Sequence, residues 1–514
     1  MSTADHGLLS PAWAGTPAAA ATSDEAVLQA MLDVEAAWVA VLADAGLCDP
    51  ADADALDAAA DAALYDTASV AARGRDGGNP LIPLLGDLRR ELRGQGISET
   101  AAATVHRGAT SQDIVDTALM LVCVRAGELL RADLARAADA LAGLATAHAD
   151  TVCVARSLTQ HALPTSFGLR AANWLAGVVA AGRRLDAALD SAPLQWGGAV
   201  GTLASLTDRL AADGADGGTG SGPGSGTADA VPSLTAALAD RLGLTDPVAP
   251  WHTNRLPVTA WGAALADVTA AAGKVAADVL ILARPEIGEV AEPGGEGRGG
   301  SSAMPQKRNP VLSVLIRSAA LAAPQQAAQL FLAAGTAVDE RPDGAWHSEW
   351  AALRELLRLA AGAAEKLAEL ATGLEVDTAA MGRNVGISGD LLVSERIVAR
   401  AAPLLGPGAP SGTATAGGTP PAGGTGPAGS AGDGAAGDGA AGDGAAEVRR
   451  LVLQSLNDGV PLRGLLRRAI DPALLSDDQL AALLDPSGYL GQSRAFIDRI
   501  AADHSEWAAS RKEP

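Results

Sequence analysis

Aromatic side chains are scarce in this chain: phenylalanine, tyrosine and tryptophan together make up 3% of its 514 residues. Cysteine is rare as well, and Cys48, Cys123 and Cys153 neither suffice for a disulfide scaffold nor form a CxxC metal-binding pair. The N-terminus has no basic stretch ahead of an apolar one, and no run of about 18 apolar residues lacks polar interruption. We therefore expect neither a secretory signal nor a membrane span. With 48% hydrophobic residues the chain can build a large core, so we expect a folded, cytoplasmic protein.

Basic residues are also fewer than acidic ones. The 38 Lys and Arg residues against 60 Asp and Glu residues give a formal net charge of −22 at pH 7. Such a chain repels phosphate backbones, and no long cluster of Lys or Arg offsets the repulsion. Nucleic-acid binding is therefore not expected as the main activity, although a local basic pocket is compatible with the overall charge.

Stretches of alternating β-branched residues are nearly absent, which excludes a large sheet, whereas strong helix formers are abundant. Apolar residues recur at helical spacing near 116–149, 164–188, 261–282 and 310–334, and small residues along such helices permit close packing in a bundle. The sequence predicts an all-α fold in three domains. These are an N-terminal helical domain (1–110), a central helix bundle (111–370) and a C-terminal helical domain (371–514). The Gly-rich segments 213–228 and 404–446 are predicted to be disordered insertions.

The segment 294–310, GGEGRGGSSAMPQKRNP, is the most informative part of the sequence. Its glycines predict a mobile loop, and Asn309 followed by Pro310 predicts an N-cap and the first turn of a helix. Ser301, Ser302 and Lys307 would then lie ahead of a helix N-terminus, where free N–H groups and the helix dipole favour an anion. A plain Gly-rich linker would explain the glycines, but not the paired serines and the lysine.

Two further polar segments precede predicted helices. In residues 105–121, Thr110 and Asp113 fit a capping box, and His106 and Arg107 stand in the turn before it. In residues 156–174, Gln160 and His161 precede Pro164, which resembles the first turn of another helix. An ordinary helix cap explains the first segment about as well as a binding site does. A lone histidine is also more often structural than catalytic.

Together these segments resemble the fumarase/aspartase superfamily. SSAMPQKRNP (301–310) is similar to its signature loop, GSSxMPxKxNP, and HRGATSQDIVDTA and RSLTQHALPTSFG are similar to its first and second motif regions, in the same order. Within the superfamily the chain resembles bacterial 3-carboxy-cis,cis-muconate cycloisomerases through GNPLIPLLGDLR (78–89), LQWGGAVGTLASL (194–206), PWHTNR (250–255), GAWHSEW (344–350) and DPSGYLGQSRAFIDR (485–499).

The resemblance implies a three-domain helical enzyme that assembles as a homotetramer through its central bundle, with each active site built from three subunits. It implies no cofactor and no metal, and a small polycarboxylate substrate. The reaction moves a proton at a carbon next to a carboxylate through an enolate-like dianion, and in cycloisomerases the substrate's own carboxylate adds across a double bond to form a lactone. Few aromatics along Ala-rich helices also favour a bundle that neighbouring subunits complete.

The resemblance also implies roles for individual residues. Ser301 would be the acid/base for the transferred proton, within a dry cationic pocket that its loop closes. Donors aimed at the substrate carboxylates would stabilise the dianion. The expected substrate-binding residues are His106, Thr110, Ser111, Gln160, Ser302, Lys307, Asn309 and Arg341.

Two positions depart from the superfamily pattern. Fumarate-releasing lyases carry a Thr-His pair where this chain has Ser157-Leu158, and leucine cannot titrate. His161 follows three residues later as a second candidate catalytic residue, but it could act near the lactone oxygen, bind a carboxylate or only orient Gln160. Arg107 replaces an expected aromatic residue, and could serve a more highly charged substrate or be a surface residue.

Three functions remain in competition. The first is a cycloisomerase, which Leu158 favours over the second function, although Arg107 mildly weakens that preference. The second is a fumarate-releasing lyase acting on an N-substituted succinate, of the adenylosuccinate type or a specialised nitrosuccinate type. The third is an inactive structural homologue, like the lens crystallins of this superfamily, which the intact set of Ser301, Lys307 and Asn309 disfavours.

Overall fold

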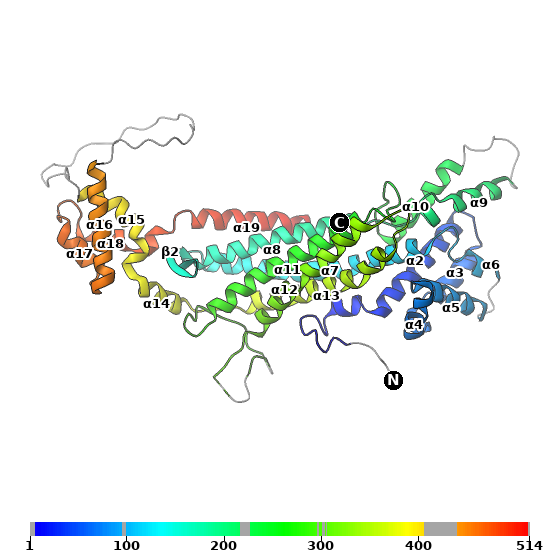
Figure 1. Cartoon of the computed structure of the whole chain (residues 1–514), viewed down its shortest axis with the longest axis horizontal. Helices are drawn as coiled ribbons and strands as arrows, with labels where there is room; N and C mark the ends of the chain where they lie inside the picture. The colour runs from blue at the N-terminus through cyan, green and yellow to red at the C-terminus, as the bar shows by residue number, and fades with distance from the viewer. Residues whose placement is uncertain are drawn as a thin grey trace.

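The computed structural model describes residues 6–94, 99–215, 227–295, 298–300, 304, 306–405 and 439–511, and these residues are predominantly helical. Long helices lie side by side along the longest axis, with shorter helices at both ends (Figure 1). The strands in the described ranges form two antiparallel pairs, β1 (Val152–Ser157) with β2 (Gln160–Ser166) and β3 (Val290–Ala291) with β4 (Glu375–Val376). The predicted all-α fold without a large sheet is confirmed.

Five long helices form the central bundle: α7 (Ser111–Ala147), α8 (Phe167–Asp190), α11 (Leu256–Leu282), α12 (Val311–Thr336) and α13 (Gly344–Gly373). Their buried faces consist mainly of Ala, Leu and Val. Small residues allow the close approach that the sequence suggested. A Cβ atom at Gly127 of α7, for example, would lie 2.9 Å from the ring of Trp261 on α11.

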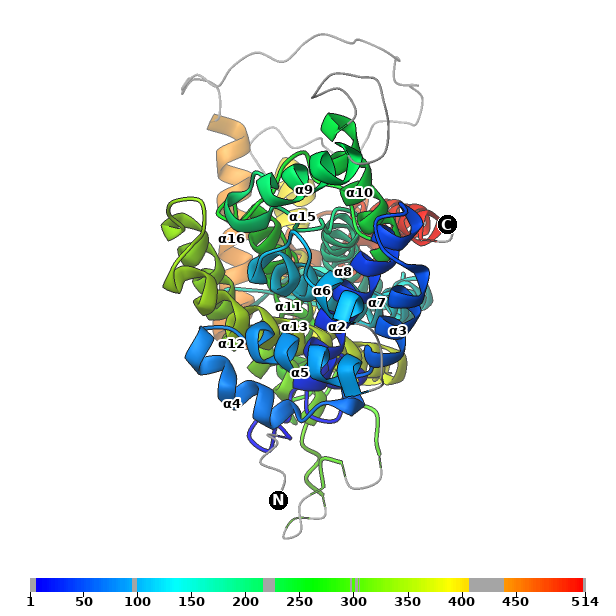
Figure 2. The same cartoon turned by 90° about the vertical axis from the view of Figure 1, so that its right-hand side faces the viewer.

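The N-terminal helices cover one end of this bundle, as the end-on view shows (Figure 2). They are α1 (Pro17–Ala21), α2 (Asp24–Asp44), α3 (Pro50–Ala59), η1 (Ala62–Leu64), α4 (Thr67–Gly77), α5 (Leu81–Gly94) and α6 (Glu99–Thr104). Near the same end lie α9 (Ala204–Ala215) and α10 (Thr227–Leu242). The short helix η2 (Gly198–Val200) lies there too, because the Gly198 N–H donates to Asp113 of α7. Buried residues of the N-terminal helices and of the bundle belong to one continuous hydrophobic core.

Helix α2 is, among the described helices, the one that is long and apolar enough to cross a membrane, with a mean hydropathy of 1.6. Most of its apolar window, 61%, is buried inside the protein, and the helix packs against α7. It also carries the buried carboxylate of Glu35. The high hydropathy of α2 is therefore that of a buried core helix. Core helices can be as long and as apolar as helices that cross a membrane.

The opposite end of the molecule holds a second, smaller hydrophobic core. Its elements follow the bundle in sequence: α14 (Thr378–Ser388), η3 (Gly389–Val393), α15 (Ser394–Ala401), η4 (Ala402–Leu404), α16 (Gly439–Asp458), α17 (Leu462–Ala469), α18 (Asp477–Leu484) and η5 (Pro486–Tyr489). The last helix, α19 (Ser493–Ser510), runs back along α8. There the Trp507 indole N–H donates to Asp186 Oδ2 at 2.6 Å, and the ring covers Gly182, where a Cβ atom would lie 2.2 Å away.

Two local predictions differ from the structure. The predicted helix 164–188 begins instead at Phe167, because residues 160–166 pair with β1 and Ser166 Oγ caps the helix by accepting from Leu169 N at 3.1 Å. Pro164 is tolerated in β2 because both strands of a two-stranded ribbon are edge strands. Within the two Gly-rich segments, which are predicted to be disordered, residues 213–215 belong to helix α9, residues 227–228 to α10 and residues 439–446 to α16. Residues 216–226 and 406–438, which make up most of the two Gly-rich segments, lie outside the described residues.

Candidate active site

Thr110 and Arg341, two of the predicted substrate-binding residues, meet at the N-terminus of α7. The Thr110 hydroxyl accepts a hydrogen bond from the Arg341 guanidinium at 2.7 Å, across 231 residues of sequence. The Asp113 half of the predicted capping box is present, because its carboxylate accepts from the Thr110 N–H at 2.9 Å. Ser111 is the first residue of the helix. A hydroxyl pair, a guanidinium and a helix N-terminus together form a donor-rich place for a carboxylate.

His106 lies in the turn before this helix and is held by α2. Its Nδ1 atom is 2.8 Å from Glu35 Oε1, and its backbone N–H donates to Glu35 Oε2 at 2.9 Å. These two contacts hold His106 in the left-handed region, at a φ of 66°, where non-glycine residues are uncommon. Arg107 donates to the carbonyl of Leu47 at 2.8 Å, so its guanidinium ties two N-terminal segments together.

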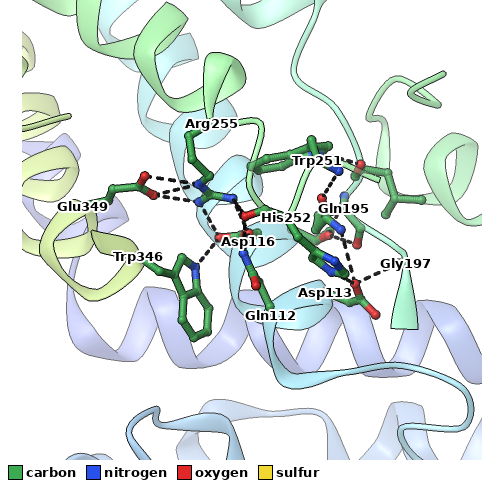
Figure 3. A network of polar contacts seen from close by, with 12 residues as sticks. Gln112, Asp113, Asp116, Gln195, Gly197, Trp251, His252, Arg255, Trp346 and Glu349 are labelled. Atoms are coloured by element: carbon green, nitrogen blue, oxygen red, sulfur yellow. Dashed lines mark hydrogen bonds and ion pairs between the residues drawn. The ribbon is translucent and has the colours of Figure 1, made fainter. Parts of the chain in front are cut away.

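Behind Thr110, the side chain of Asp113 binds several groups from distant segments of the chain (Figure 3). Its buried Oδ1 accepts from the N–H of Gly197 at 2.9 Å and lies 2.8 Å from His252 Nε2, while Oδ2 accepts from the N–H of Gly198 at 2.9 Å. Gly197 has to be glycine, because a Cβ atom there would lie 2.8 Å from the His252 ring. A single carboxylate thus fixes the α7 N-terminus, the loop before η2 and the loop before α11.

One turn further along α7, a buried ion triad supports the same end. Arg255 lies between Asp116 and Glu349, at 2.6 Å and 2.9 Å from the Asp116 oxygens and 2.7 Å from Glu349 Oε2 (Figure 3). The Trp346 indole donates to Asp116 Oδ1 at 2.8 Å. Burial raises the pKa of the Glu349 carboxyl, and the neighbouring Arg255 only partly opposes that effect. Burial alone would lower the pKa of Arg255, but the two carboxylates overcome it and raise that pKa.

His161 and Gln160 lie at the other end of the bundle, on the β1–β2 hairpin. His161 Nδ1 is 2.8 Å from Ser388 Oγ at the end of α14. Gln160 is exposed, and its amide donates to Thr159 Oγ1 at 3.2 Å. The hairpin tip consists of Leu158 and Thr159, at φ values of 49° and 72°, and Leu158 is 92% exposed. The position that carries a histidine in fumarate-releasing lyases is therefore an outward-pointing apolar tip.

The segment before α12 differs from its prediction in one respect. Asn309 is not the N-cap: Pro310 occupies that position, and the Asn309 N–H donates to Gly299 O at 2.9 Å. The Glu292 carboxylate instead accepts from the N–H groups of Leu312 and Ser313, at 2.9 Å and 2.7 Å. The predicted anion position at this helix N-terminus is thus filled by the chain's own carboxylate, which supplies the compensating charge.

Lys307 is exposed and its backbone N–H donates to Met304 O at 2.9 Å. The expected acid/base Ser301 and the adjacent Ser302 lie outside the described residues.

The structure separates the predicted site residues into two groups. Helix α12 has 26 residues, so at ~1.5 Å per residue it places Asn309 and Arg341 roughly 40 Å apart. Helix α7 has 37 residues and separates Thr110 from the hairpin by more than that. His106, Thr110, Ser111 and Arg341 gather at one end, whereas Gln160, His161, Lys307 and Asn309 belong to the other. One chain by itself cannot bring both groups onto one small substrate.

Several residues of the first group's support were not predicted from the sequence. The buried polar network behind Thr110 is formed by five residues that had no predicted role: Asp116, Gln195, His252, Arg255 and Glu349. The segments 194–206, 250–255 and 344–350 entered the sequence analysis only as points of resemblance to the cycloisomerases. One signal in the sequence points to Asp116: it is a charged residue within an apolar helical segment, and a buried charge needs a partner. In the described part of the chain, no group of three or more His, Cys, Asp or Glu residues could hold a metal ion.

The chain is similar over most of its length to enzymes of known activity. The lyase family matches residues 16–324. The chain is 42% identical to a nitrosuccinate lyase of Streptomyces davaonensis, covering 96% of this chain and 94% of that protein. It is 37% identical to a 3-carboxy-cis,cis-muconate cycloisomerase of Pseudomonas aeruginosa, covering 95% and 94%.

The fold is similar to the crystal structure of the 3-carboxy-cis,cis-muconate lactonizing enzyme from Pseudomonas putida, with a TM-score of 0.80, 32% identity and coverage of 98% of this chain and 100% of that one. The helical bundle, the motif regions and these relatives agree, and the chain belongs to the lyase family of the fumarase/aspartase superfamily.

Proposed function

We propose that this enzyme lactonises 3-carboxy-cis,cis-muconate or a close relative, with Ser301 transferring a proton at the carbon next to a carboxylate. The observation that carries the proposal is the Arg341–Thr110 pair at the α7 N-terminus, at 2.7 Å. It offers a guanidinium, a hydroxyl and helix N–H groups to a substrate carboxylate. Such preorganised donors stabilise the negative charge that accumulates on that carboxylate in an enolate-like dianion.

The reaction begins at one double bond of the substrate. A carboxylate oxygen of the substrate forms a bond to one carbon of the double bond, and the π electrons move toward the other carbon and its carboxylate. The Ser301 hydroxyl delivers a proton to that carbon, and the serine regains a proton from solvent. The remaining donors, Lys307, Asn309, Gln160 and Ser302, bind or position the substrate. No cofactor or metal takes part in these steps.

A second candidate is the elimination of nitrite from nitrosuccinate. The observation that favours it is the 42% identity to a nitrosuccinate lyase, and the leucine at position 158 is compatible with this particular elimination. Here Ser301 would take the proton next to a carboxylate, the C–N bond would break, and nitrite would leave with the electron pair to give fumarate. Nitrite is a stable anion that needs no protonation to leave, whereas an amine does. Leu158 therefore fits nitrite release better than the release of an amine.

Either reaction requires more than one copy of the chain, and we propose a homotetramer. The two groups of site residues are separated by the length of the bundle helices, so different subunits have to supply them. Helix α12 exposes Leu321, Phe331 and Leu332, at 66%, 53% and 62%, which suits a bundle covered by neighbours. The proposal includes a cytoplasmic location, which the three unpaired cysteines support.

A substrate panel with purified protein tests the proposal. With 3-carboxy-cis,cis-muconate the ultraviolet band of the conjugated diene should disappear. With nitrosuccinate, equal amounts of fumarate and nitrite would identify the second candidate. Ser301→Ala should lower kcat at least ~100-fold for the true substrate, and Ser302→Ala should lower it less. Turnover of neither substrate, or a Ser301→Ala enzyme with unchanged kcat, would overturn the mechanism.

A further inference from the structure

The contact between His161 and Ser388 joins two parts of the chain that are 227 residues apart. His161 Nδ1 and Ser388 Oγ are 2.8 Å apart, both side chains being partly buried. The other ring nitrogen, Nε2, has no hydrogen-bond partner among the described residues. His161 also lines a cavity of about 910 Å³ with Thr159 and Arg156. One edge of the imidazole is therefore held while the other is free.

The position of Ser388 is itself determined by a buried hub. Asn384, four residues earlier and on the same face of α14, donates to Glu289 Oε1 at 2.8 Å and to Ile287 O at 2.9 Å. Glu289 is fully buried and accepts from Arg156 at 2.8 Å. Arg156 is the cross-strand neighbour of His161 in the β1–β2 ribbon. The hub thus sets the spacing between α14 and the strand pair, which brings Ser388 to Nδ1.

We propose that Ser388 is a positioning residue for His161: its hydroxyl accepts a hydrogen bond from Nδ1–H, so that Nε2 is the nitrogen that gains and loses a proton. This inference rests on the proposed function in one respect: it takes His161, a candidate catalytic residue by the resemblance, to act as an acid/base in that reaction. Which imidazole nitrogen carries the proton is set by the hydrogen bond of the other. A serine oxygen that accepts from Nδ1–H serves both states of the ring, because Nδ1 keeps its proton while Nε2 exchanges one. The held edge also fixes the ring plane, as productive proton transfer requires.

Other charged groups surround the same cavity. Arg156 and Arg170 contact Glu289, and Lys274 pairs with Asp278 at 2.6 Å. Arg284 and Glu286 also line the cavity. Asp390, two residues after Ser388 on η3, accepts from Arg463 N at 3.3 Å. Guanidinium, ammonium and carboxylate groups ordinarily titrate well away from neutral pH, whereas imidazole titrates near it. Of the groups that line this cavity, His161 is therefore the one whose loss a near-neutral limb of the rate profile can report, and the spectra described below distinguish it from His106.

Kinetics of Ser388 variants test the inference. Ser388→Ala should lower kcat by ~10-fold or more, in the range typical for loss of a partner that orients a functional histidine, with KM nearly unchanged. The near-neutral limb should move to lower pH, because the imidazolium loses an acceptor. Ser388→Thr keeps the hydroxyl, so its kcat and the position of its near-neutral limb should match those of the unchanged protein. The control is Ser348→Ala, which removes another partly buried serine, one that accepts from Gln329 at 3.0 Å. An unmoved limb in Ser388→Ala, or equal losses in the control, would overturn the inference.

A spectroscopic measurement tests the same point without catalysis. Solid-state ¹⁵N spectra of histidine-labelled protein should show His161, identified by its loss in His161→Asn, as the Nδ1–H tautomer above neutral pH. Ser388→Ala should shift this population toward Nε2–H. The Nε2–H tautomer in the unchanged protein would overturn the inference, even where a variant fails to fold. If instead His161→Asn leaves kcat intact while Ser388 controls the tautomer, the catalytic role of His161 fails and the positioning stands.

Discussion

Replacing Arg255 by methionine should destabilise the protein far more than removal of a comparable surface arginine. Arg255 is 2% exposed and lies between Asp116 and Glu349, which are 0% and 1% exposed. Its removal leaves two carboxylates buried without a counter-ion and deletes every guanidinium contact to them. Breaking a buried ion pair by removal of one partner costs about 3–5 kcal/mol of unfolding free energy. Methionine retains most of the aliphatic stem, so lost packing adds little.

Arg125→Met is the matched control. Arg125 binds Asp33 at 2.6 Å, a distance equal to that between Arg255 and Asp116, but the two side chains are 45% and 27% exposed. Solvent screens such a pair, and its loss should cost about 0–1 kcal/mol. Urea unfolding followed by circular dichroism measures both variants, and kcat should fall only in Arg255→Met, since the triad supports the Thr110 end of the site. Equal losses of stability in the two variants would refute the argument from burial.

The pH dependence of the Arg255→Met loss gives an independent check. Burial raises the pKa of Glu349 above its ordinary value of 4.5, and without Arg255 the effect that opposes burial is gone. The folded state then binds more protons than the unfolded state, so the free energy of unfolding falls as the pH rises above that value. The destabilisation should be larger at pH 8 than at pH 5, and adding Glu349→Gln should recover part of it. A loss that does not depend on pH would contradict this account.

Three further predictions concern the two ends of the bundle. Burial would raise the pKa of Glu289, but hydrogen bonds from Arg156 and Asn384 hold that pKa below its usual value. The ionised Glu289 carboxylate therefore stabilises the folded protein above the usual pKa, and this contribution should be lost as the pH falls through the lowered pKa. Glu289→Gln should therefore flatten the acid side of the stability profile, which thermal unfolding between pH 3 and 6 can detect. Thr110→Val should raise KM about 10-fold while lowering stability little, because the hydroxyl accepts from Arg341 rather than from the helix; unchanged kinetics would remove Thr110 from the site. Leu158→Asn should raise the Tm, because a leucine at a φ of 49° costs about 1–2 kcal/mol and asparagine tolerates that region. A lower Tm would mean that another subunit covers the tip.

The sequence was sufficient for the features that depend on local pattern. Helical periodicity and the scarcity of β-branched alternation predicted the bundle, and the Thr110–Asp113 spacing predicted a capping contact that the structure contains. The motifs also identified the family, because they carry the same side chains in the same order. Such signals lie within one or two helical turns, or in the order of short segments, and both are legible in a linear chain.

Features that depend on distant segments required the tertiary structure. Nothing near Pro164 in sequence indicated a strand, since β2 exists only because residues 152–157 pair with it. Asn309 is a good capping residue, yet Glu292, some 20 residues away, reaches the helix N-terminus instead. Asp113 binds Gly197 84 residues away, Arg255 binds Glu349 94 residues away, and His161 contacts Ser388 227 residues away. Folding alone brings these pairs within hydrogen-bond distance. Buried polar groups have to find such partners because water cannot reach them, but which partner each one finds is decided by how the helices pack.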